Sequence, residues 1–119
     1  MVKLVVKNIS FISGMPTDIT DDMVDIMVIL EDNSSYMFEV TTPQALANYM
    51  IIHKQKFVDP DYPAIIVSEL TETVIKEAIQ AFINELDDGF WFKLYSSTLY
   101  FTTDDLDLII DRHNKEEEN

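Results

Sequence analysis

The sequence predicts a single α+β domain: a mainly antiparallel sheet with helices packed on one face, in the order β-β-β-α-β-α-β-β-α. Two observations lead to this fold class. Hydrophobic residues make up 47% of the 119 residues, which is enough for one core at this length. Segments of alternating polarity are interleaved with segments of helical period, which is typical of α+β domains. We expect residues 1–114 to form the globular domain and residues 115–119 to form a frayed acidic tail.

Three strands are expected in the first third of the chain. The apolar side of residues 1–12 switches after Asn8, so a β-bulge is expected there. Residues 23–31 alternate an apolar side with a mixed one, and residues 36–40 alternate again after the turn cluster 32–35. The second and third strands should therefore pair as an antiparallel hairpin, with one face on the core and one partly solvated.

A helix and a short strand are expected next. Thr42 has the side chain of an N-cap, and Pro43 follows at the first helical position, where a missing N–H costs nothing. This helix should end near residues 54–56, where lysines suit the C-terminal dipole. Residues 64–67 are a short, β-branched apolar run, which favours a buried strand.

The clearest element is a helix over residues 70–86, which should stop before Gly89. Thr71 can act as its N-cap, and Leu70 with Ile75 can form a hydrophobic staple. Its apolar residues at helical spacing are Val74, Ile75, Ala78, Ile79, Phe82 and Leu86.

Residues 90–95 and 98–102 are expected to form two short aromatic strands. Thr102 or Thr103 should then cap a last helix, with Asp104 and Asp105 in its first turn.

The balance of charge is strongly acidic. The chain has 22 Asp and Glu against 8 Lys and Arg, for a net charge of −14. Direct nucleic-acid binding and binding to an anionic membrane both need a basic surface, so we exclude both. If electrostatics steers a partner, that partner is a basic protein.

The composition also removes several kinds of chemistry. The chain has no Cys, two His and two Gly, which excludes thiolate catalysis, thiolate zinc sites and glycine-rich phosphate loops. No catalytic motif is present, so we expect neither an enzyme nor a cofactor. The first residues lack a signal-peptide pattern, and no apolar run approaches the roughly 18 residues of a membrane span. We therefore expect a cytoplasmic protein.

The aromatic segment 90–101 is the first candidate site. Half of its side chains should point away from the core if it forms strands, and we expect Trp91, Tyr95 and Tyr100 to be at least partly accessible. Trp and Tyr are common anchors of protein interfaces. The alternatives are that helices cover both faces or that the segment packs in a homodimer.

Carboxylates form the other candidates. Asp104, Asp105, Asp107 and Asp111 give the last helix an acidic face, which either binds a partner or only offsets the helix dipole and is solvated. Asp18, Asp21, Asp22 and Asp25 would gather on a helix and could then bind Ca²⁺ or Mg²⁺, but they lead into a strand, so no metal is assigned. His53 and His113 each lie near a helix end, where a cation is favoured, and neither has a partner His nearby in sequence.

The sequence favours a non-enzymatic module that binds or inhibits a basic protein partner, by the mechanism of acidic immunity-type inhibitors: steering by charge, then burial of aromatic anchors. The alternatives are a nucleic-acid mimic that occupies a DNA- or RNA-binding cleft, an acid-rich metal-dependent hydrolase, and a solubilising subunit or scaffold domain.

Overall fold

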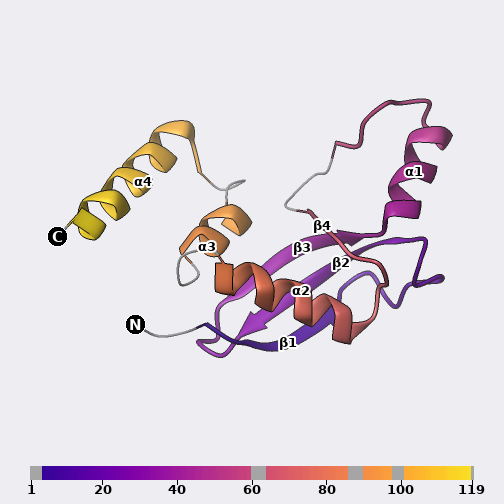
Figure 1. Cartoon of the computed structure of the whole chain (residues 1–119), viewed down its shortest axis with the longest axis horizontal. Helices are drawn as coiled ribbons and strands as arrows, with labels where there is room; N and C mark the ends of the chain where they lie inside the picture. Colours follow the sequence, from indigo (N-terminus) through magenta and orange to yellow (C-terminus); the bar gives the residue numbers. More distant parts are fainter. Residues whose placement is uncertain (1–3, 60–63, 86–89, 98–100, 119) are drawn as a thin grey trace.

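The computed structural model describes residues 4–59, 64–85, 90–97 and 101–118 (Figure 1). These residues form a four-stranded sheet and four helices, which confirms the α+β class. The strands are β1 (Val6–Phe11), β2 (Met23–Leu30), β3 (Ser35–Thr41) and β4 (Ala64–Ile66). The helices are α1 (Pro43–Ile52), α2 (Glu72–Glu85), α3 (Phe90–Ser97) and α4 (Thr103–Glu118).

The sheet has the order β1-β2-β3-β4. β2 pairs antiparallel with β1 and β3, as the predicted hairpin requires, and β4 joins β3 in parallel. The register between β1 and β2 shifts between Val6 and Asn8, so the predicted bulge is confirmed. The bulge lets Val6 and Ile9 both face the core, although they are an odd number of residues apart.

One face of the sheet, the core face, carries the hydrophobic core. Alternate positions of β2 are buried, because successive strand side chains point to opposite faces. α2 crosses this face (Figure 1) and buries a stripe of isoleucines with a four-residue spacing. These isoleucines are Ile75, Ile79 and Ile83. Thr71 caps α2 as predicted, because its hydroxyl accepts a hydrogen bond from Val74 N at 3.3 Å.

The edge of the sheet at the start of β1 is partly covered by a side chain of α2. Gln80 Oε1 accepts a hydrogen bond from Val6 N at 2.9 Å, and Gln80 Nε2 donates to the Leu4 carbonyl at 3.1 Å. One amide group therefore satisfies a donor and an acceptor that a neighbouring strand would otherwise satisfy. Covering an edge in this way reduces its tendency to pair with another chain.

α1 begins as predicted, because the Thr42 hydroxyl accepts from Ala45 N at 3.3 Å and Pro43 occupies the first helical position. It ends at Ile52 with His53 as its C-cap, and Lys54 has a positive φ of 55°. Ile51 and Ile52 at its end are 73% and 74% exposed. The last turn of α1 therefore presents two large apolar side chains to solvent.

The prediction for residues 90–95 is wrong: they form helix α3, not a strand. A short run of aromatic residues fits either structure, so its sequence period does not decide between them. Tertiary packing decides instead, because the helix directs Phe92 into the core at 1% exposure. The second predicted aromatic strand, 98–102, falls largely outside the described residues; Phe101 and Thr102 belong to no strand.

α4 begins at the predicted cap, Thr102, and extends further than expected. Lys115 to Glu118, expected as a frayed tail, continue the helix. The Cα radius of gyration is 15.9 Å, against roughly 13–14 Å for a compact domain of this length. Figure 1 shows the reason, since α4 stands away from the sheet, at the opposite end of the molecule from α1.

Candidate protein-binding cleft

An apolar cleft of about 630 Å³ is lined by residues of α2, α3 and α4 and of strands β3 and β4. Its walls are made of aromatic and aliphatic side chains. These are Phe38, Ile65, Phe82, Trp91, Phe92, Leu94, Tyr95, Leu106 and Ile110. An open cleft with this lining is suited to apolar groups of a ligand or partner, and it offers little for acid–base chemistry.

The floor of the cleft is rigid and belongs to the core. Phe92 of α3 and Phe38 of β3 are each 1% exposed, and their ring centroids lie 5.4 Å apart. Tyr36 meets Phe92 edge-on at 5.6 Å. Such aromatic pairs contribute about 0.5–1.5 kcal/mol beyond the area that they bury. They fix the position of α3 on the sheet.

The rim of the cleft contains exposed aromatic residues. Phe82 of α2 is 43% exposed and Tyr95 of α3 is 47% exposed. The Tyr95 ring stacks on Phe38 at 6.4 Å, and its hydroxyl donates to the Ala64 carbonyl at 3.4 Å. Tyr95 is thus held in place while half of its surface remains open to a partner.

α4 forms the far wall and is attached through a histidine. The His113 ring lies parallel to Phe90 with 3.7 Å between the centroids, and Trp91 meets His113 edge-on at 5.8 Å. His113 therefore packs against aromatic rings at the α3–α4 contact. This contact keeps Leu106 and Ile110 facing the cleft.

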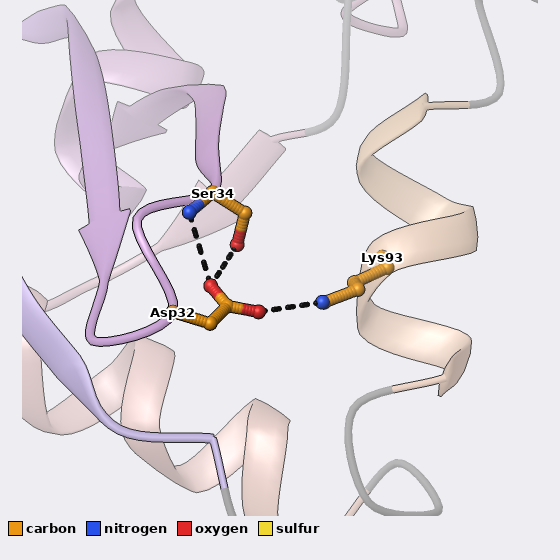
Figure 2. Close-up of polar contacts among 3 residues, drawn as sticks. All are labelled: Asp32, Ser34 and Lys93. Carbon is orange, nitrogen blue, oxygen red and sulfur yellow. Dashed lines mark hydrogen bonds and ion pairs between the residues drawn. The ribbon is translucent and has the colours of Figure 1, made fainter.

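An ion pair fixes α3 to the turn between β2 and β3 (Figure 2). Lys93 Nζ lies 2.9 Å from Asp32 Oδ2, and Asp32 Oδ1 accepts hydrogen bonds from the Ser34 hydroxyl and backbone N–H. The Ser34 hydrogen bonds and the Lys93 ammonium hold the pKa of Asp32 well below its usual value. The same carboxylate raises the pKa of Lys93.

The α4 acids Asp104, Asp107 and Asp111 are exposed, and none of them is among the residues that line the cleft. Asp107 is three residues from the cleft-lining Ile110, and Asp104 and Asp111 are its neighbours at i−3 and i+4. These three carboxylates therefore form one edge of α4, which we call the acidic edge.

Asp105 has a different role. It accepts from Thr102 N at 3.0 Å while its own N–H donates to the Thr102 hydroxyl at 3.1 Å. This reciprocal pair caps α4, and the Thr102 hydrogen bonds lower the pKa of Asp105. Asp105 also lines a second, more polar hollow of about 570 Å³ on another side of α4.

The other acidic candidates serve the loop before β2. Asp18 accepts from the Thr20 hydroxyl and N–H, Asp22 accepts from Thr17 N, and Asp21 accepts from the Asn48 amide at 2.9 Å. Within the described part of the chain, no group of three or more His, Asp or Glu side chains is placed to hold a metal ion.

The structure thus brings Trp91 and Tyr95 together in one cleft, and α4, the helix that carries the predicted acids, contributes Leu106 and Ile110 to the same cleft. Tyr100 lies outside the described residues. The sequence interpretation missed Phe82, Leu106 and Ile110 as cleft residues. The sequence did contain a sign that Phe82 is accessible, because this residue lies one position away from the buried stripe Ile75, Ile79 and Ile83 and therefore at its side.

Comparisons of this chain with protein-family models, with curated proteins and with solved structures found no significant match. The described helices include none with the length and hydrophobicity needed to cross a bilayer.

Proposed function

We propose that the protein is a non-enzymatic binding module that engages a basic protein partner through the cleft between α2, α3 and α4. The observation that carries this proposal is an open, apolar, aromatic cleft walled on one side by α4, the helix that also carries the acidic edge. Partner side chains would enter the cleft, and partner Lys or Arg residues would face Asp104, Asp107 and Asp111. An inhibitor of a basic protein works by the same physics.

The cleft can supply the affinity. One aromatic anchor buries about 150–250 Å², which corresponds to about 4–6 kcal/mol at 25 cal/mol per Å² before the cost of association. The rigid floor at Phe38 and Phe92 adds no ordering cost of its own, because both rings are already fixed in the core. On binding, a partner would cover the surface of Phe82 and Tyr95 that is exposed in the unbound protein.

The charge can supply the rate. A net charge of −14 attracts a basic partner at long range. Exposed charges at the rim of an interface mainly change the association rate and its salt dependence. The acidic edge and the cleft therefore make separable contributions.

The test is to cross-link the protein to partners in cells, identify them by mass spectrometry, and measure the affinity of the purified partner for variants. We expect Phe82→Ala and Tyr95→Ala each to weaken binding by about tenfold or more. Phe57→Ala is the matched control, because Phe57 is 62% exposed and does not line the cleft.

Two results would contradict the proposal. Equal affinities for all three variants would remove the cleft from the interface. Binding that is insensitive to Phe82→Ala and Tyr95→Ala but is lost when Asp104, Asp107 and Asp111 become Asn would favour a nucleic-acid mimic instead.

A further inference from the structure

The second face of the sheet, opposite the core face, is rich in methionine. The burial pattern of β2 alternates, so Met23, Asp25, Met27 and Ile29 share this outer side. On β3 the outward positions include Met37 and Glu39. Met27 lies directly opposite Met37 across the two strands. We call this surface, made of these six residues together with Ile66 of β4, the methionine face.

The methionine face is accessible. Met37 is 40% exposed and Ile66 is 60% exposed, while Met23, Met27 and Ile29 are partly exposed. Methionine side chains are flexible and polarisable, so they adapt to different apolar partners. Surfaces of this composition re-pack around the helix that they bind.

An anchoring hollow continues this face. A pocket of about 330 Å³ lies where α1 meets β3 and β4. It is lined by Met23, Glu39, Thr41, Leu46, Met50, Val58, Ala64 and Ile66. A dry cavity of about 150 Å³ holds a benzene ring, so this hollow has room for one large apolar side chain.

The charge of the face indicates the occupant. Asp25 and Glu39 are directly opposed across β2 and β3, and they are the charged residues at the outward positions of these two strands. A cationic side chain seated between Met27, Met37 and the Asp25 carboxylate would complement this negative charge.

We propose that the methionine face binds a basic amphipathic helix of a partner protein. Apolar side chains of that helix would cover the methionines and enter the hollow, and its Lys or Arg residues would face Asp25 and Glu39. α2 covers the core face of the same sheet in this manner, with Ile75, Ile79 and Ile83. A second copy of the chain fits poorly, because each copy carries −14 and would bring like carboxylates together.

The test uses methionine-methyl NMR on the full chain. The probe is a synthetic Leu–Lys amphipathic peptide of roughly 18 residues, long enough for about five helical turns. A peptide of the same composition in scrambled order is the control. We expect saturable shifts of the Met23, Met27 and Met37 methyl signals with the ordered peptide only, while the signal of Met15 in the loop before β2 stays in place.

The same titration separates this inference from the proposed function. None of the described residues that line the cleft is a methionine, whereas Trp91 is one of them. A change in Trp91 emission while the methionine methyl signals stay unchanged would place the peptide in the cleft and overturn the inference. Equal shifts with the scrambled peptide, no shifts, or methyl shifts that depend on protein concentration alone would also overturn it.

Two charge-matched variants complete the test. Met37→Lys introduces a cation into the methionine face, and Met15→Lys introduces one at a residue that is 75% exposed outside it. We expect Met37→Lys to weaken peptide binding by about tenfold. Met15→Lys changes the net charge of the protein by the same amount, so any loss of peptide affinity that it causes measures the effect of charge alone. Equal losses would overturn the inference.

Discussion

Lys93 Nζ on α3 lies 2.9 Å from Asp32 Oδ2 in the turn between β2 and β3. The two residues are far apart in sequence, so the ion pair joins the helix that carries Trp91 and Tyr95 to the sheet. The side chains are 38% and 35% exposed, and solvent therefore screens much of their attraction.

This ion pair predicts a stability difference that depends on pH. We expect Asp32→Asn to lower the free energy of unfolding at neutral pH by up to ~1 kcal/mol. Folding lowers the pKa of Asp32 below its ordinary value of 3.8. The contribution of Asp32 to stability is therefore fully present above pH 3.8 and is lost as the pH falls through the lowered pKa of the folded protein. Urea denaturation of the parent and of Asp32→Asn should give a difference in the free energy of unfolding that narrows below about pH 4. A difference in stability that widens on acidification would contradict a stabilising role for the Asp32 carboxylate.

The position of α3 depends on one buried ring. Phe92→Ala removes the side chain that meets Phe38 and Tyr36, and we expect it to cost about 3–5 kcal/mol of stability. Phe57→Ala, at an exposed site, should stay within about 0.5 kcal/mol of the parent. Chemical denaturation measures both. Similar losses for the two variants would mean that Phe92 does not fix α3.

The capping pair at the start of α4 predicts a local effect. Thr102→Ala removes the hydroxyl that accepts from Asp105 N, and loss of such a cap costs about 0.5–2 kcal/mol of helix stability. We expect Cα chemical shifts of the first turn of α4 to move toward coil values. Thr103→Ala, one residue further along, is the control and should leave them unchanged. Equal fraying of both variants would count against Thr102 as the cap.

The acidic edge predicts a kinetic effect on partner binding. Asp107 and Asp111 are an i,i+4 pair of like charge on α4, so replacing both with Asn should leave α4 as stable or slightly more stable. Association with the basic partner should slow, most strongly at low salt, while dissociation changes little. Stopped-flow kinetics over a salt series measures this. A change confined to the dissociation rate would contradict a steering role.

The sequence predicted the elements whose local signals agree with their packing. Alternation in β2, the switch of apolar side at Asn8 and the Thr42 and Thr71 caps are all local, and the structure confirms them. Residues 90–95 lack such a signal, because a dense run of aromatic residues suits a strand or a helix. Packing of Phe92 on Phe38 decides the outcome, and these residues are distant in sequence.

The candidate cleft was predictable only in part. Trp91 and Tyr95 were recognisable because these residue types anchor interfaces. The convergence of Phe82, Leu106 and Ile110 on the same space follows from how α2 and α4 are placed against α3. Spacing along the chain carries no information about that placement.

The central claim is that the cleft receives the partner, and Trp91 reports on it most directly, because it is the single tryptophan of the chain and lines the cleft. The measurement is the emission of Trp91 and its quenching by acrylamide during titration with the purified partner. We predict a blue shift and reduced quenching that saturate together with binding. Saturated binding with unchanged emission and unchanged quenching of Trp91 would contradict the account.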